Sequence, residues 1–226
     1  MHFTLRGARL VDATMDLAEA DITVAGTHIE QVGRDLYAPG RVLDASSAIV
    51  MPGFIEVHTH GGGGFELHTT DVNEIRAYAH WVPSAGVTSF LVAVVGTPGA
   101  LPLEQLRTAV KAIEQPGKGA EALGIYLEGP YLNVKRRGAH PPAWLRQPNP
   151  VETEQILELA RGHLRLITLA PELPGAHALI QCLVEAGVTV SIGHTDATFE
   201  QTEEAIALGV THATHCFNAM RPLLHR

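Results

Sequence analysis

The chain has 226 residues, of which 46% are hydrophobic and 18% are charged, a composition typical of a globular protein. Its formal net charge of −8 argues against binding to nucleic acid or to an acidic membrane surface, and no apolar run approaches the length of a membrane span. The two cysteines, Cys182 and Cys216, are too few for a disulfide framework and favour a reducing, cytoplasmic location.

Residues 1–48 predict a small β domain. Short runs rich in β-branched and aliphatic residues are separated by Gly7, Gly26, Gly33 and Pro39-Gly40, which is the turn spacing of a small sheet or sandwich. The candidate strands are Phe3–Leu5, Ala8–Val11, Asp21–Val24, His28–Val32 and Arg41–Asp44. No candidate catalytic residue lies in this region.

A mostly apolar run, Ala48–Val57, ends at His58-Thr59-His60 and is followed by the four glycines Gly61–Gly64. In a strand, residues two apart point to the same face, so His58 and His60 are expected to project together at the strand end. The glycines let the backbone pass close to whatever the histidines hold. The alternative is a pair of surface histidines in a turn.

Strand-like and helical patterns then alternate to the end of the chain. Apolar runs of strand length predict strands at Thr88–Val95, Ala122–Leu127, Leu164–Ala170, Val188–Ile192 and Val210–Thr214, after the first at Ala48–Val57. Helices are predicted between them at Val72–Ser84, Leu103–Gln115, Glu152–Arg161, Ala176–Ala186 and Thr198–Leu208, the last with the capping-box pair Thr198 and Gln201. Residues 49–226 therefore predict an α/β fold: a partial (β/α)8 TIM barrel with about six of its eight strands. An open doubly wound sheet is the alternative.

Candidate metal ligands follow several of the predicted strands. Glu128, His194 and His215 each stand at or just beyond a strand end, as His58 and His60 do. Parallel neighbouring strands bring their C-terminal ends together, so these side chains are expected to converge. Imidazoles with one carboxylate suit Zn(II), Fe(II), Mn(II) or Co(II), and the ligand types do not choose among these ions.

The long segment Tyr131–Pro150 carries the basic cluster Lys135-Arg136-Arg137. It is either a solvated face or a source of positive charge for an anionic substrate. We expect Glu172 to be a structural residue. Asp196 is expected to be a turn or near-cap residue that could also orient His194.

Six segments follow one another in a distinctive order: PGFIEVHTHGGGG, YLEGPYLN, GAH, LAPE, SIGHTDAT and THCFNAM. In this order and spacing, from about residue 5 onward, the chain resembles the N-acetylglucosamine-6-phosphate deacetylases of the amidohydrolase superfamily. The resemblance implies a (β/α)8 barrel with a small β domain, and a cytoplasmic enzyme that is a homodimer at its full length. It implies metal-dependent hydrolysis of the acetamide of N-acetyl-D-glucosamine 6-phosphate to D-glucosamine 6-phosphate and acetate, in amino-sugar catabolism.

The same resemblance assigns roles to residues of this chain. Glu128, His194 and His215 are implied to bind the catalytic metal, zinc or iron, and the retained His58 and His60 make a second ion plausible. His140 is implied to polarise the acetyl carbonyl. The implied substrate-binding set is Ala139, His140, Asn218, Ala219 and Arg226, the last a phosphate ligand supplied across the dimer interface.

The resemblance also implies parts that residues 1–226 lack. Family members continue with two more strands and with an aspartate, after the eighth strand, that acts as general base. We therefore expect a C-terminally truncated barrel with little activity on its own. Two alternatives remain: an amidohydrolase for a related acetamido sugar phosphate or another amide, or an inactive metal-binding fragment.

Overall fold

The computed structural model describes residues 1–222, so Arg226 lies outside the described residues. The chain divides into two compact units, Met1–Gly53 and Phe54–Arg226. The apolar run at 48–57 is shared between them, because Ile49–Val50 forms strand β5 and pairs with β1 of the first unit, whereas Phe54 begins the second. This division falls five residues after the boundary expected from the sequence.

The first unit is a single mixed sheet. Its strands are β1 (His2–Val11), β2 (Asp16–Ala25), β3 (His28–Gly33), β4 (Arg41–Asp44) and β5, in the order β3-β2-β1-β4 with β5 also on β1. The predicted break at Gly7 is wrong: β1 runs through it with a register shift between Leu5 and Ala8. Gly7 adopts a φ of 75° there, and its N–H donates to the buried Asp21 carboxylate at 3.0 Å, which makes the irregularity stable.

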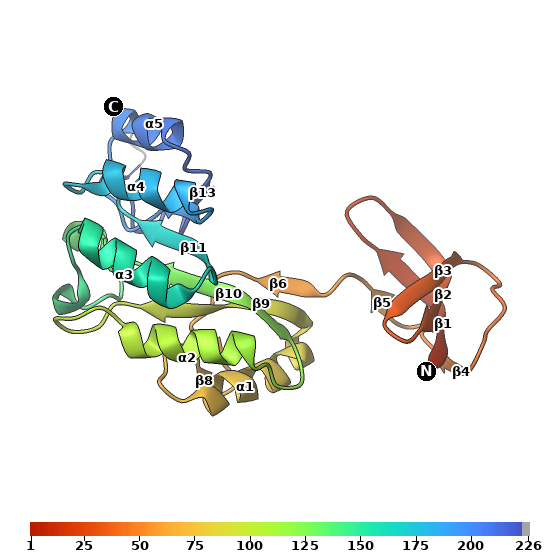
Figure 1. Cartoon of the computed structure of the whole chain (residues 1–226). Helices are drawn as coiled ribbons and strands as arrows, with labels where there is room; N and C mark the ends of the chain where they lie inside the picture. The colour runs from red at the N-terminus through yellow and green to blue at the C-terminus, as the bar shows by residue number, and fades with distance from the viewer. Residues whose placement is uncertain (223–226) are drawn as a thin grey trace. The chain divides into compact units, whose positions relative to one another are not determined.

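The second unit is built on a six-stranded parallel sheet that curls as part of a barrel (Figure 1). Its order, β13-β12-β11-β10-β9-β6, is that of the chain. The strands are β6 (Phe54–Glu56), β9 (Val87–Val95), β10 (Glu121–Glu128), β11 (Leu164–Leu169), β12 (Thr189–Ile192) and β13 (His212–Ala213). The six-strand partial barrel predicted from the sequence is confirmed, although β6 and β13 are shorter than expected.

One helix connects each strand to the next. These are α1 (Val72–Trp81), α2 (Leu103–Glu114), α3 (Pro150–Ala160), α4 (Ala176–Glu185) and α5 (Phe199–Ala207). In Figure 1, α2 to α5 follow one another along one face of the sheet. The predicted capping box is present, since Thr198 Oγ1 accepts from Gln201 N and the Gln201 side chain accepts from Thr198 N. Short elements complete the unit: β7 (Gly61–Gly62), β8 (Phe65–Glu66), and 3-10 turns at Val82–Ala85, Val134–Arg136 and Pro142–Trp144.

Both faces of the central strands are buried, which explains their continuous apolar runs. Alternate residues such as Val92, Val94, Ile125 and Leu127 pack under the helices in the main core. The residues between them, Leu91, Ala93 and Tyr126, form a separate cluster on the opposite face.

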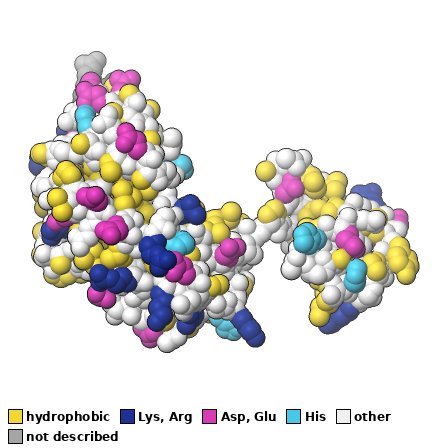
Figure 2. Space-filling view, in the orientation of Figure 1, with side chains coloured by type: hydrophobic (Ala, Val, Ile, Leu, Met, Phe, Trp, Pro, Cys, Tyr) yellow, Lys and Arg dark blue, Asp and Glu magenta, His cyan; other side chains and the backbone are white. Residues whose placement is uncertain are grey.

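The outer surface is mixed in charge. The face drawn in Figure 2 carries Lys and Arg side chains interspersed with Asp and Glu over the larger unit. None of the helices between residues 1 and 222 combines the length and the apolar character needed to cross a bilayer.

Candidate metal centre

Five side chains chosen from the sequence meet at the C-terminal ends of the parallel strands. Glu128 is the last residue of β10. Three histidines each stand two residues beyond a strand end: His58 after β6, His194 after β12 and His215 after β13. His60 lies between the end of β6 and the glycines Gly61–Gly64. Its convergence with His58 therefore comes from the loop and not from the strand pleat predicted for it.

The Glu128 carboxylate is the centre of the group. Its Oε1 lies 3.4 Å from His58 Nε2, 3.0 Å from His194 Nε2 and 3.1 Å from His215 Nε2. Its Oε2 lies 3.0 Å from His60 Nε2. Two triads share this carboxylate, His58/His60/Glu128 and Glu128/His194/His215, and within each the ligand atoms lie within 4.8 Å of one another.

The orientation of His194 explains why a cation fits here. Its Nδ1 lies 2.9 Å from the carbonyl oxygen of Arg136, which can only accept, so Nδ1 carries the proton. In the neutral ring the Nε2 lone pair then faces a carboxylate oxygen at 3.0 Å. Two acceptors in that position need a proton or a cation between them. Donor atoms about 2.0–2.1 Å from a tetrahedral zinc lie roughly 3.3 Å apart, so the spacing suits a metal.

The charges within the group are strongly coupled. Burial by itself raises the pKa of Glu128, but hydrogen bonds from the surrounding histidines outweigh it and hold the pKa far below its usual range. The hydrogen bond to Glu128 raises the pKa of His60. Burial alone would lower the pKa of His194, but its bonds to Glu128 and to the Arg136 carbonyl raise it. Burial, by contrast, lowers the pKa of His215. The carboxylate therefore stays ionised and ready to bind a cation.

The backbone around the ligands is held in an unfavourable region. His194 and His215 have φ values of 50° and 55°, and Phe217 and Ala219 have 70° and 48°. Non-glycine residues with positive φ are uncommon and cluster at functional sites. Gly138 is close by: a Cβ there would lie 3.0 Å from His194 Cε1.

His140 reaches the same carboxylate from the loop after β10. It is 8% exposed, and its Nε2 lies 3.6 Å from Glu128 Oε2. Arg137 fixes this loop, since its Nη1 donates to the His140 carbonyl at 2.9 Å. Ala139 is exposed beside it.

The remaining candidates lie on the loop after β13. Asn218 is exposed, and its N–H donates to the carbonyl of His215. The Ala219 carbonyl accepts from Thr195 N at 3.1 Å, which ties this loop to the one carrying His194. In the basic cluster, Arg136 is paired with Asp196 at 2.9 Å, while Lys135 is largely exposed.

Glu172 has the structural role expected of it. Its carboxylate accepts from Asn133 Nδ2 at 2.9 Å, from Thr195 Oγ1 at 2.5 Å and from Asp196 N at 2.6 Å. It thus joins the loops that follow β10, β11 and β12. Two contacts were missed from the sequence, the Arg136 carbonyl on His194 and the Tyr126 ring against His58. A backbone acceptor and a buried aromatic ring leave no sequence motif.

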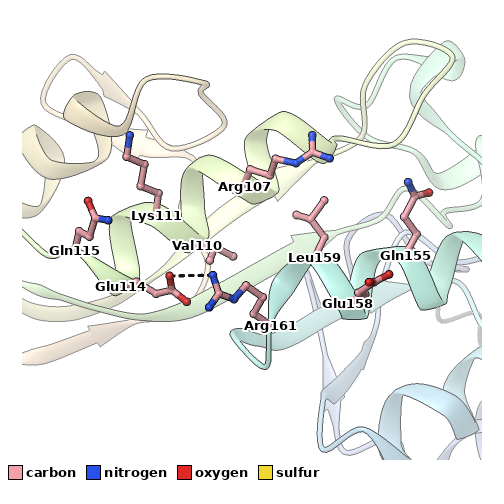
Figure 3. Close-up of a pocket in the computed structure, with 9 residues that line it drawn as sticks. All are labelled: Arg107, Val110, Lys111, Glu114, Gln115, Gln155, Glu158, Leu159 and Arg161. Carbon is pink, nitrogen blue, oxygen red and sulfur yellow. Dashed lines mark hydrogen bonds and ion pairs between the residues drawn. The ribbon is translucent and has the colours of Figure 1, made fainter.

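A separate concavity lies between α2 and α3 (Figure 3). It has a volume of about 620 Å³, and Arg161 on its wall is paired with Glu114 at 3.3 Å. No candidate ligand lines it, so it is not part of the metal centre.

Known proteins with similar sequences include deacetylases of acetamido sugar phosphates. The amidohydrolase family pattern matches residues 49–225. An N-acetylglucosamine-6-phosphate deacetylase of Lysinibacillus sphaericus is 34% identical, over all of this chain and 59% of that protein. An N-acetylgalactosamine-6-phosphate deacetylase of Escherichia coli O157:H7 is also 34% identical, with the same coverage. The chain thus spans about three fifths of the length of these relatives.

A solved structure shows the same fold. A mutant N-acetyl-D-glucosamine-6-phosphate deacetylase from Mycobacterium smegmatis, in complex with N-acetyl-D-glucosamine-6-phosphate, superposes with a TM-score of 0.90 at 35% identity. This match covers 100% of the present chain and 58% of that one.

Proposed function

The chain belongs to the amidohydrolase family, and from that premise we propose that it carries the metal site of an acetamido sugar phosphate deacetylase. The proposed reaction is hydrolysis of N-acetyl-D-glucosamine 6-phosphate: the amide C–N bond breaks, and water supplies the acetate oxygen and the proton for the amine. The observation that carries the proposal is the convergence of four histidines on the buried Glu128.

We assign one divalent ion to Glu128, His194 and His215, and a second to Glu128 with His58 and His60, zinc or iron being the expected metals. Such an ion supplies Lewis acidity to polarise a carbonyl and to lower the pKa of water. The chain's own residues hold it in place: the Arg136 carbonyl fixes the His194 ring, and the burial of Glu128 keeps bulk water from competing.

His140 is assigned to the acetyl group. It is buried, and its Nε2 faces the same carboxylate as the metal ligands, so its N–H is placed to donate to an oxygen that gains negative charge there. Arg137 positions it through the backbone carbonyl of the same residue. Ala139, next to His140, is assigned to the substrate-binding loop.

We assign the binding of the substrate's sugar phosphate to the loop after β13 and to the basic cluster Lys135-Arg136-Arg137. Asn218 and Ala219 stand three and four residues after His215, on the same loop, so they are assigned to contact a sugar bound beside the metal. Arg136 and Lys135 both face Asp196, at 2.9 and 3.9 Å, and Lys135 is the more available of the two because its side chain is 75% exposed. Arg226, expected from the resemblance to bind phosphate in a homodimer, completes this proposal. We also propose a cytoplasmic location, since Cys182 and Cys216 are free thiols.

The epimeric substrate N-acetyl-D-galactosamine 6-phosphate is a second candidate, because the Escherichia coli relative of that name is as similar as the first. A direct test loads the chain with zinc and measures acetate release from both sugar phosphates and from unphosphorylated N-acetylglucosamine. It is run beside a version extended with the C-terminal remainder of the Mycobacterium smegmatis relative. Turnover of a phosphorylated sugar by the extended version, lost in Glu128→Gln, supports the proposal. Turnover of the unphosphorylated sugar alone contradicts it.

A further inference from the structure

Four buried hydroxyl groups form a continuous chain next to the candidate metal centre. Tyr126 Oη lies 2.8 Å from Thr168 Oγ1, which lies 2.8 Å from Thr214 Oγ1. Thr214 Oγ1 in turn lies 2.8 Å from Ser191 Oγ. All four residues are at most 7% exposed, so these hydroxyls satisfy one another away from water.

The position of this hydroxyl chain follows from the strand register. Tyr126 and Glu128 are two residues apart on β10 and therefore face the same side of the sheet. Glu128 is directly paired with Thr168 on β11, and Thr168 with Ser191 on β12. The hydroxyl chain thus runs from β10 across β11 and β12 to Thr214, the residue after β13, at the level of the Glu128 carboxylate. Barrel interiors are usually filled by bulky branched apolar residues, so a hydroxyl layer here is a departure.

Two residues of the hydroxyl chain support candidate metal ligands directly. The Tyr126 ring lies against the His58 ring, with centroids 4.6 Å apart. Thr214 immediately precedes His215, so the bonds to its hydroxyl fix the backbone from which that ligand projects. The His58 and His215 rings are themselves only 4.8 Å apart.

The residue at 193 leaves room for the hydroxyl chain. A Cβ on Gly193 would lie 2.7 Å from Thr168 Cγ2 and 2.9 Å from Thr214 Cβ, closer than real side chains approach. The Thr168–Thr214 bond therefore depends on glycine at the position just before His194.

We propose that the hydroxyl chain Tyr126–Thr168–Thr214–Ser191 positions His58 and His215 and thereby sets how tightly the centre holds a divalent metal. The inference rests on the proposed function, because it assigns positioning residues to that same site. Apolar residues of equal volume would fill the space, but the directional hydroxyl bonds add to the backbone ladder in fixing where the strand ends lie. These four are positioning residues, since none is placed to touch substrate.

The test compares Thr168→Val with Thr153→Val. Both remove a buried hydroxyl at constant shape, but Thr153 lies on α3 and bonds the Asn149 carbonyl, outside the hydroxyl chain. Zinc affinity is measured by competition with a chromophoric chelator, and the melting temperature of each metal-free variant is recorded. We expect Thr168→Val to weaken zinc binding by about 10- to 100-fold and Thr153→Val to leave it unchanged. Ser191→Ala, at the end of the hydroxyl chain, provides a milder variant with the same expected direction.

The outcomes separate this inference from the proposed function. Zinc affinities of Thr168→Val and Ser191→Ala equal to that of Thr153→Val, with Glu128→Gln clearly weakened, overturn the positioning role and leave the metal site intact. Unchanged affinity in Glu128→Gln overturns the metal site and the positioning role together. The positioning role is also overturned if zinc affinity falls in proportion to melting temperature in all variants, Thr153→Val included.

Discussion

The two triads that share Glu128 differ in how firmly they are held. His194 is 4% exposed, and its second ring nitrogen is bonded to the Arg136 carbonyl. His60 is half exposed, follows a strand of three residues and sits beside a glycine loop. A ligand whose ring is fixed loses less entropy when it binds a metal and is already in the right tautomer. Because it contains His194, the Glu128/His194/His215 triad should be the tighter half of the centre, even though the His215 side chain is 40% exposed and that of His58 is 23% exposed.

The largest effect is expected from the shared ligand. Glu128→Gln removes the negative charge from both triads, and we expect zinc affinity to fall by at least about 100-fold, or about 2.7 kcal/mol. Elemental analysis after gel filtration measures the bound zinc. Glu114→Gln, in the concavity between α2 and α3, is the matched control and should keep the full zinc content. Equal zinc in the two variants would remove Glu128 from the ligand set.

The second prediction compares one ligand from each triad. His194→Asn should weaken zinc binding by about 100-fold, whereas His60→Asn should weaken it by about 10-fold, because only His194 is buried and held by a second bond. Chelator competition at fixed pH measures both. A larger loss in His60→Asn would reverse the ranking of the two triads.

The third prediction concerns pH. His60 and His194 have pKa values raised above 6.5, so they hold protons at higher pH than a free histidine. Metal binding needs neutral rings, so zinc affinity should fall as pH falls through these raised values. In the metal-free chain the sign is opposite: their contribution to stability is fully present below 6.5 and is lost as pH rises through the raised pKa values. Proton release on zinc binding, measured by calorimetry in buffers of different ionisation enthalpy, should be positive near neutral pH.

The smallest effect is expected one step further from the metal. Asp196→Asn weakens the hold on Arg136, whose carbonyl orients His194. We expect only about a two- to fivefold loss of zinc affinity, since the backbone keeps most of the geometry. Asp16→Asn also breaks an arginine pair, but in the first unit, and should show no loss.

The sequence predicted the barrel well because its central strands are buried on both faces and its helices are separated by strong stop signals. It predicted that Glu128, His194 and His215 converge, because parallel strands bring their ends together whatever the loops do. It failed at Gly7, where a hydrogen bond from the Gly7 N–H to the carboxylate of the distant Asp21 lets the strand continue. It also assigned the meeting of His58 and His60 to a strand pleat, although β6 ends at Glu56 and the loop places them.

The supporting contacts could not be predicted in the same way. The bond from His194 to Arg136 uses a carbonyl that every residue possesses, and the Tyr126–Thr168–Thr214–Ser191 chain depends on the register of four strands. Such contacts are set by three-dimensional placement and not by residue type or spacing.

The most direct measurement is the zinc content of three proteins after equilibration with a weak chelator: the unaltered chain, His58→Asn/His60→Asn, and His194→Asn/His215→Asn. We expect the first double variant to keep one tightly held zinc and the second to lose it. Retention of tight zinc by the second variant and its loss from the first would contradict the placement of the principal metal site on Glu128, His194 and His215.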